Sequence, residues 1–336
     1  MRHRNPSDGK ASQGKWWMIV ALIATLFLLL SAVTIGTYLC GLLDQMQFSD
    51  DDVTISQEEL QQYIQSETEI VQDMDEVTID RSTEEAIHSD DVINILLVGQ
   101  DARPGESRAR ADTVMVCSYH KTKKTLTVVS FMRDMYVQIP GYPDHKLNAA
   151  FAWGGMDLLS QTLQWNFGIE IAGGFWVDFS AFEDVVDAIG GLDIYLTAAE
   201  ARYLNPYQYQ EGINHLDGVA ILTYCRIRGI GNGDFDRTVR QQNVIHAVIE
   251  LCRTMEPAEQ RKLLETILPL VGTNMDKWEI LQYTAEMMPA AFGVQMNEKL
   301  RIPAEGAYQA GWASGMWVLI PDLVENRKIL RAALYF

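Results

Sequence analysis

The chain has 336 residues, 48% of them hydrophobic, which is enough for a sizeable core in one large domain or two small ones. Its net charge of −18 comes largely from residues 44–91, which hold 16 acidic residues against Arg81 alone. The rest of the chain has 26 basic and 29 acidic residues, so its arginines stand in a nearly neutral background. An acidic chain of this kind is a poor candidate for nucleic-acid binding, and we expect no nucleic-acid partner.

The N-terminal region has the pattern of a membrane anchor. Residues 1–15 carry four basic residues and one acidic residue, and residues 16–43 carry no charge at all. An uncharged run of this length exceeds the roughly 20 residues that a bilayer span requires. The basic flank predicts a cytoplasmic tail at 1–15, a single span at 16–43 and the remainder outside the cell membrane. A cleaved signal peptide is the alternative, although its apolar region would be shorter and would end in a small-residue cleavage site.

Residues 44–90 are acidic and rich in Gln, Ser and Thr. Such a composition buries little apolar surface, so the segment is interpreted as a solvated extracellular stalk. A short helix is possible within it, starting at Ser56.

The segment from 91 to 255 is predicted to form the main folded domain. Strands are expected at 92–98, 113–119, 125–131, 174–179 and 192–197, and helices at 148–167, 180–189, 216–224 and 234–254. The first helix would continue through Gly154 and Gly155, and Ser180 would cap the second. Strands that alternate with helices predict an α/β/α sandwich. The early hairpin-like turn at 121–124 makes its central sheet mixed rather than wholly parallel.

Residues 256–336 are expected to form an extension packed on this core. Two helices, a strand pair formed by Lys299–Ile302 and Met316–Ile320, and a last helix from Asp322 are predicted there. No residues of this extension suggest chemistry.

Short polar islands interrupt the apolar sequence of this folded domain. They contain Asp101 and Arg103, then Arg110 and Asp112, then Arg133 and Asp134, then Arg226 and Arg228 followed by Asp234, Arg237 and Gln241. The first three islands touch predicted strands, so they would bring several Arg and Asp side chains to one edge of the sheet. Arg is suited to a bidentate grip on phosphate oxygens, and Asp is a ligand for Mg²⁺. Together they suggest phosphoryl transfer from a pyrophosphate.

Local geometry gives some of these residues a common direction. In extended chain, residues i and i+2 point the same way, which pairs Asp101 with Arg103, Arg110 with Asp112 and Arg226 with Arg228.

The helical islands allow structural as well as functional readings. Asp234, Arg237 and Gln241 share one helix face, although Asp234 could equally be a helix cap. Lys146 and Asn148 precede a helix and could form an anion site there, or Asn148 could simply cap it. Asp134 could be a general base or the partner of an arginine.

The common sequence motifs of hydrolases and NTPases are absent from the sequence. The six histidines form no H-E-x-x-H motif, and no G-x-S-x-G or P-loop sequence occurs. The four cysteines show no C-x-x-C spacing and are expected to be buried thiols, with Cys225 a remote candidate for a nucleophile.

The islands, in this order and spacing, resemble the LytR-CpsA-Psr family. The matching segments are 94–101, 110–113, 133–134, 146–151, 182–193 and 224–242. The resemblance covers about residues 91–255, and the membrane anchor agrees with it. The sequence departs from the family at Met132 and Met135, where Pro and Thr are common, which leaves the local turn open.

The resemblance implies transfer of a glycopolymer from an undecaprenyl pyrophosphate carrier to peptidoglycan with Mg²⁺, as in teichoic acid or capsule attachment. By this likeness Asp101 and Asp112 would serve the metal. Arg110, Arg133, Arg226 and Arg228 would grip the pyrophosphate, and Asp234 and Gln241 would complete the site. A polyprenyl tail needs a long apolar cavity. We expect it between the sheet and the helices at 148–166 and 216–254, with Phe151, Trp165 and Phe179 as walls.

Two other functions remain open at this stage. One is a hydrolase that cleaves the polyprenyl pyrophosphate with water as acceptor. The other is a non-catalytic lipid-binding or regulatory protein of the cell envelope.

Overall fold

The computed structural model describes residues 41–48, 54–67, 85–101, 109–291, 293–297 and 299–336. The chain divides into two compact units, Met1–Gln45 and Met46–Phe336, and the second holds the fold described below. Among the described residues, no helix has the length and the apolar character of a membrane span. The expected span at 16–43 lies outside the described residues except for its last three positions, so it stays a prediction.

The second unit is built on one mixed sheet of eight strands. Its order is β1-β10-β7-β2-β3-β4-β11, and β12 also pairs with β4. The strands are β1 (Gln47–Phe48), β2 (Val92–Gln100), β3 (Ala111–His120), β4 (Thr125–Phe131), β7 (Gly173–Asp178), β10 (Gly272–Thr273), β11 (Gln295–Met296) and β12 (Leu300–Ile302). β2, β3 and β4 are antiparallel neighbours, whereas β2 and β7 run parallel. The prediction of a mixed central sheet is confirmed.

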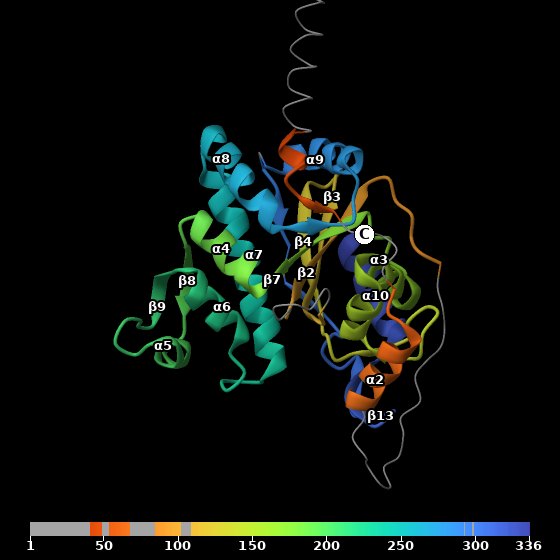
Figure 1. The fold of residues 1–336 in the computed structure, drawn as a ribbon. Helices are drawn as coiled ribbons and strands as arrows, with labels where there is room; N and C mark the ends of the chain where they lie inside the picture. The colour runs from red at the N-terminus through yellow and green to blue at the C-terminus, as the bar shows by residue number, and fades with distance from the viewer. Residues whose placement is uncertain (1–40, 49–53, 68–84, 102–108, 292, 298) are drawn as a thin grey trace, which may run out of the picture. The chain divides into compact units, whose positions relative to one another are not determined.

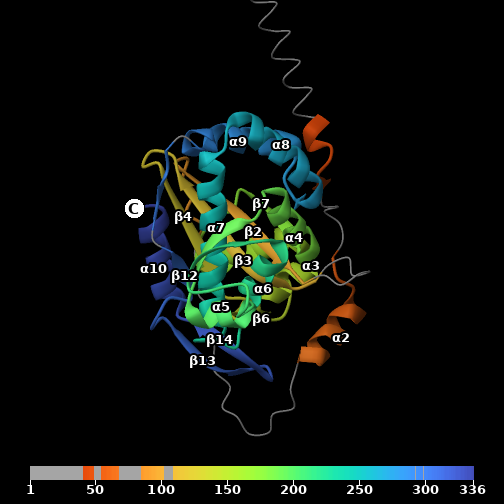
Figure 2. The same ribbon diagram turned by 90° about the vertical axis from the view of Figure 1, so that its left-hand side faces the viewer.

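Helices cover both faces of this sheet (Figure 1). α3 and α10 lie on one face, and α4, α6 and α7 lie on the other, as the turned view in Figure 2 also shows. The helices are α2 (Gln57–Glu67), α3 (Leu147–Phe167), α4 (Phe179–Ala188), α5 (Ala198–Leu204), α6 (Gly218–Arg226), α7 (Asp234–Thr254), α8 (Pro257–Ile267), α9 (Lys277–Ala291) and α10 (Leu323–Leu334). Because both faces are covered, β2 buries side chains that point to either face, which explains its largely apolar sequence.

The described residues also form three small two-stranded sheets. They pair β5 (Tyr136–Val137) with β6 (His145–Lys146), β8 (Leu192–Leu196) with β9 (Gly212–Leu216), and β13 (Tyr308–Ala313) with β14 (Met316–Pro321). The expected strand at 192–197 is therefore present, but it belongs to a separate hairpin rather than to the central sheet. The strand pair predicted in the C-terminal extension is wrong in its pairing. β12 adds to β4 in the main sheet, and β14 pairs with β13, which the sequence analysis did not predict.

Two local expectations are corrected by the backbone. α3 is interrupted at Gly154 and Gly155, where Gly155 has a φ of 65° and a Cβ on Gly154 would lie 2.6 Å from that of Leu158. Glycine is thus required at this break both for the dihedral angle and for the close approach. α4 is capped by Asp178, whose carboxylate accepts from the Ala181 backbone N–H at 2.7 Å, and not by Ser180. A carboxylate placed two residues earlier accepts from one of the free N–H groups and lets the helix begin at Phe179.

The acidic segment before the catalytic domain contributes to the fold. α2 forms inside it, beginning with a Ser56–Glu59 capping pair, and buries Leu60 to 5% exposure in the main hydrophobic cluster. One face of α2 is therefore packed on the core, whereas most of its other side chains are exposed to solvent. The reason is that Leu60, Tyr63 and Ile64 lie at i, i+3 and i+4 and give an acidic helix one apolar face.

Candidate functional site

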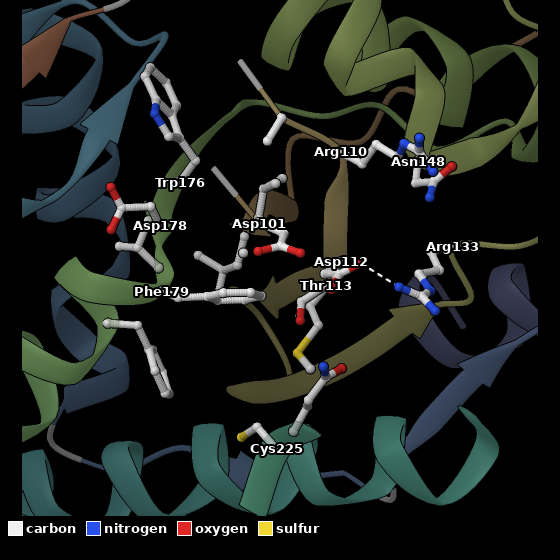
Figure 3. Close-up of a pocket in the computed structure, with 18 of the residues that line it drawn as sticks. Asp101, Arg110, Asp112, Thr113, Arg133, Asn148, Trp176, Asp178, Phe179 and Cys225 are labelled. Atoms are coloured by element: carbon white, nitrogen blue, oxygen red, sulfur yellow. Dashed lines mark hydrogen bonds and ion pairs between the residues drawn. The ribbon is translucent and has the colours of Figure 1, made fainter. Parts of the chain in front are cut away.

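A large cavity lies beside the central sheet. Its volume is about 1660 Å³, and its lining comes from β2, β3, β7 and from α2, α4, α6, α7 and α8. Figure 3 shows Trp176 and Phe179 on one side of this space and Arg110 and Arg133 on the other, with Asp101 and Asp112 between them. The cavity thus has an apolar part and a charged part.

Arg133 is the centre of the charged part. It lies in a turn closed by a hydrogen bond from the Met135 N–H to the Met132 carbonyl, and both methionines are buried in the core. The sequence did not predict the conformation of this turn, because Met132 and Met135 depart from the family pattern. The structure shows that both methionines anchor the turn by packing in the core. The guanidinium forms an ion pair with Asp112 and lies 3.5 Å from Asp134 and 3.6 Å from Asp234. Burial alone would lower the pKa of Arg133, but these three carboxylates outweigh it and raise that pKa, so the group stays charged.

The first turn of α7 supplies a second cation, and this one is buried. Arg237 donates to the backbone carbonyl of Asp112 at 3.2 Å and to the carboxylate of Asp234 at 3.0 Å, and it is only 3% exposed. Burial, and then the neighbouring Arg133, lowers the pKa of Arg237. Asp234 is the first residue of α7, after Gly233 as the cap, and its carboxylate joins Arg133 to Arg237.

The end of α6 places two more arginines at the cavity. Arg226 lies over the ring of Phe179, 4.6 Å from its centroid. Arg228 is more than half exposed, and its Nε is 3.9 Å from Asp234. Both line the cavity. Both therefore face the same space, although Arg226 is the last residue of α6 and not part of the extended segment that was predicted.

The other predicted binding residues also reach the cavity. Lys146 precedes α3, and its ammonium lies 3.1 Å from the carboxylate of Asp134. Asp134 is therefore held between Arg133 and Lys146. Arg110 lies over the ring of Tyr63, with 4.9 Å between guanidinium carbon and ring centroid. Gln241 lines the cavity from the second turn of α7.

The carboxylates suit a weakly held magnesium ion. Asp101 and Asp112 both line the charged part of the cavity (Figure 3). The described residues contain no group of three or more His, Cys, Asp or Glu placed to bind a metal. Mg²⁺ keeps several waters and takes phosphate oxygens, so two carboxylates suffice when a pyrophosphate is present. The residues present therefore fit a metal that arrives with its substrate. Arg103, which was paired with Asp101 in the sequence, lies outside the described residues.

The proposed lipid walls are only partly correct. Phe179 lines the cavity, but Phe151 is buried in the main core and Trp165 is 46% exposed. The cavity does not run along α3, as was expected, and only its first turns reach it through Asn148 and Ala152. The reason is that α3 packs tightly on the sheet. The apolar walls come instead from Leu97, Val98, Met115, Phe175, Trp176, Val177, Phe182, Leu222, Val244, Ile245, Leu264, Ile267, Leu268 and Val271.

Two further residues and one helix revise the sequence analysis. Burial raises the pKa of the cavity-lining Cys225 thiol to about 12, which argues against a thiolate nucleophile. Arg240 is buried, and its guanidinium donates to Glu200 at 2.6 Å and to the carbonyls of Ile227 and Ile230. It thus holds the loop that carries Arg228, a role that the spacing did not reveal. α2 was also missed as a part of the site, although its i, i+3, i+4 apolar spacing could have indicated it.

Fold, charged cluster and apolar cavity together define a LytR-CpsA-Psr type of protein. The model of the LytR_cpsA_psr family matches residues 54–331, and the chain belongs to this family. The matched range includes α2 and most of the C-terminal extension.

Similar proteins are found in Staphylococcus and Bacillus species. The chain is 31% identical over 229 residues to the regulatory protein MsrR of Staphylococcus aureus (strain COL), covering 66% of this chain and 68% of MsrR. It is 30% identical over 244 residues to the polyisoprenyl-teichoic acid–peptidoglycan teichoic acid transferase TagU of Bacillus mycoides (strain KBAB4), covering 71% and 77%.

Solved structures agree with the fold. TagT bound to LI-WTA has a TM-score of 0.60 at 25% identity, and covers 77% of this chain and 100% of its own. TagV of B. subtilis has a TM-score of 0.58 at 26% identity, with 74% and 99% covered.

Proposed function

We propose that this protein transfers a glycopolymer from an undecaprenyl pyrophosphate carrier to a sugar hydroxyl of peptidoglycan, with Mg²⁺. The observation that carries the proposal is that the apolar part of the cavity leads directly into a cluster of six basic side chains. A polyprenyl pyrophosphate has the matching two parts, because its long apolar tail suits the apolar part of the cavity and its pyrophosphate suits the basic cluster. Family membership and the transferase name of TagU support the same reaction class.

The proposed reaction exchanges one bond at phosphorus for another. The acceptor hydroxyl oxygen bonds to the phosphorus that carries the glycopolymer, and the bond from that phosphorus to the bridging oxygen breaks. Polyprenyl phosphate leaves with the bridging oxygen, and the hydroxyl proton is released. Such a reaction depends on charge stabilisation more than on covalent catalysis.

The basic residues would supply that stabilisation. Arg133 and Arg237 are fixed by carboxylates before substrate binds, so their donors need little reorganisation as charge builds on the leaving phosphate. Arg110, Arg226 and Arg228 would hold the remaining oxygens with bidentate contacts. Mg²⁺ at Asp101 and Asp112 would add positive charge next to the phosphates. Asp134 lies between two cations, and we assign it the role of holding Arg133 and Lys146 rather than of a base.

The test uses a synthetic undecaprenyl pyrophosphate carrier with a short labelled glycan, soluble peptidoglycan strands and Mg²⁺. We expect label in the peptidoglycan and release of polyprenyl phosphate in equal amounts. Release without labelled peptidoglycan would establish the hydrolase instead. Binding of the carrier without release of polyprenyl phosphate would establish a non-catalytic binding protein instead. This alternative is retained because the similar protein MsrR is named a regulatory protein.

A filled cavity tests the place of the lipid. Val177 lines the apolar wall on β7, and Val177→Trp would occupy part of the space. We expect it to weaken binding of the undecaprenyl carrier while leaving a short-chain pyrophosphate carrier nearly unaffected. Equal binding of the long carrier by both proteins would place the tail elsewhere.

We further propose that the protein is anchored in the cell membrane by residues 16–43, with its catalytic unit outside. The basic flank before an uncharged run supports this orientation. Protease added to intact protoplasts should digest the catalytic unit. A protected unit would contradict the orientation.

A further inference from the structure

The helix before the catalytic domain reaches the charged part of the cavity. α2 contributes Glu59, Gln62, Tyr63 and Ser66 to the lining. The Tyr63 ring lies under the Arg110 guanidinium at 4.9 Å. An acidic segment that reads as a spacer in the sequence therefore lies against a residue of the proposed pyrophosphate site.

Several contacts fix the position of α2 on α3. The Ile55 N–H donates to the Trp153 carbonyl at 3.0 Å, and Leu60 is buried in the main cluster. The Tyr63 ring packs edge-on against Trp153, with 5.6 Å between ring centroids and an angle of 79°. It also lies 5.8 Å from the ring of His145. Trp153 is fully buried, so the ring of Tyr63 rests on a rigid part of the core.

An aromatic face beneath a guanidinium restricts its motion. The attraction between cation and ring holds one face of the guanidinium, and the edge keeps its N–H donors for oxygen acceptors. A long arginine otherwise loses substantial side-chain entropy when it grips a phosphate. A tyrosine that orders it beforehand lowers that cost.

We infer that Tyr63 is a positioning residue for substrate, which orients Arg110 toward the pyrophosphate, and that α2 is an integral part of the site. The inference rests on the proposed function only in taking a pyrophosphate as the ligand of Arg110. It adds a segment outside the range of 91–255 on which the resemblance was recognised.

Binding measurements on four single variants test this role. The probe is a soluble short-chain polyprenyl pyrophosphate with Mg²⁺, titrated against the wild type, Tyr63→Phe, Tyr63→Leu, Arg110→Ala and Tyr142→Leu. Tyr63→Leu should weaken binding roughly fivefold to tenfold, the range of a partly desolvated cation–π contact. Tyr63→Phe keeps the aromatic face and should bind within about twofold of the wild type. Tyr142→Leu is the matched control, because Tyr142 also packs on Trp153, at 5.5 Å between ring centroids.

A double variant separates positioning from a general effect on the fold. In the Arg110→Ala background, Tyr63→Leu should change the affinity by less than about twofold, because the group on which it acts is gone. The same loss in both backgrounds, or an equal loss in Tyr63→Phe, would overturn the inference. Thermal unfolding of each variant checks that it is folded, and Tyr63→Met replaces Tyr63→Leu if the latter is not.

These experiments distinguish a failure of the Tyr63 inference from a failure of the proposed transferase function. A wild type that binds the probe but transfers nothing would remove the transferase proposal, and the affinity cycle would still decide the role of Tyr63. A wild type that transfers glycan with no dependence on Tyr63 would remove the inference alone.

Discussion

Two arginines of this protein, the partly buried Arg133 and the buried Arg240, have different surroundings. The Arg240 guanidinium donates to Glu200 at 2.6 Å and to the carbonyls of Ile227 and Ile230 at 3.0 and 3.4 Å. Arg133 instead lines the cavity, and its charged neighbours are the carboxylates of three aspartates.

The difference separates a structural cation from one suited to a ligand. The Arg240 guanidinium donates to backbone carbonyls on both sides of Arg228, so its donors are used to hold the conformation of that loop. The carboxylates around Arg133 preset its orientation while its position on the cavity lets a phosphate approach. The comparison predicts that loss of the first pairing costs stability, whereas substitution of Arg133 costs activity.

The largest effect is expected when Arg240 loses its partner. Glu200→Ala leaves a buried, unpaired guanidinium and also removes the Glu200 side of the α5 capping box. It should lower the free energy of unfolding by about 3–5 kcal/mol, measured by urea denaturation. Glu250→Ala is the control, because it removes the partner of the solvent-facing Arg253 and should cost about 0–1 kcal/mol. Equal losses in the two variants would erase the distinction.

The next effect concerns Arg133 itself. Arg133→Lys keeps the charge but loses the planar fork, so glycan transfer should fall by roughly 10²-fold or more, the scale of a single electrostatic donor. Carrier affinity should fall far less, since the apolar tail supplies most of it. Transfer rate and affinity are measured in the same protein, beside Arg253→Lys as a surface control. An unchanged rate would place the chemistry elsewhere, and equal losses would make Arg133 only a binding residue.

The metal assignment predicts a smaller effect. In Asp112→Asn, the Mg²⁺ concentration for half-maximal transfer should rise by about tenfold, because one of two carboxylate ligands is lost. A loss that acted only through Arg133 would lower the rate without changing the Mg²⁺ dependence. Asp193→Asn, on the exposed β8–β9 hairpin, serves as the control. Mg²⁺ dependence equal to the wild type would contradict the assignment.

A modest pH dependence is expected beside the charged part of the cavity. Burial, with Lys146 and Arg110 nearby, lowers the pKa of His145 to about 4 from 6.5. Between these values the unfolded chain binds a proton that the folded chain does not, so stability falls as pH decreases from 6.5 to 4. His145→Phe should flatten this part of the stability profile, measured by urea denaturation across pH. A profile as steep as that of the wild type would assign the dependence to other groups.

Most local features of the catalytic domain could be read from the sequence. The helix at Asp234–Thr254 and the strand at Thr125–Phe131 have the predicted bounds, because turn residues precede each of them in the sequence. Among the described site residues, every predicted Arg and Asp lies at or next to the cavity. The errors concern partners: β12 and β14 were paired with each other, and Phe151 and Trp165 were placed on the cavity. Spacing along the chain does not say which face of α3 meets the sheet or which strand accepts a new edge.

The sequence alone determined the residue types of the site and their order, since Arg, Asp and turn residues stand out locally against apolar strands. Only the tertiary structure decided which of them touch. Asp112 and Asp234 are 122 positions apart in the chain, yet Arg133 lies between their carboxylates. Tyr63 belongs to an acidic segment that the sequence predicts to be solvated, whereas in the structure its ring packs against Trp153. Such contacts depend on how distant elements pack. Burial of the apolar face of a helix or strand selects the element against which it packs, and this packing then determines which polar side chains meet.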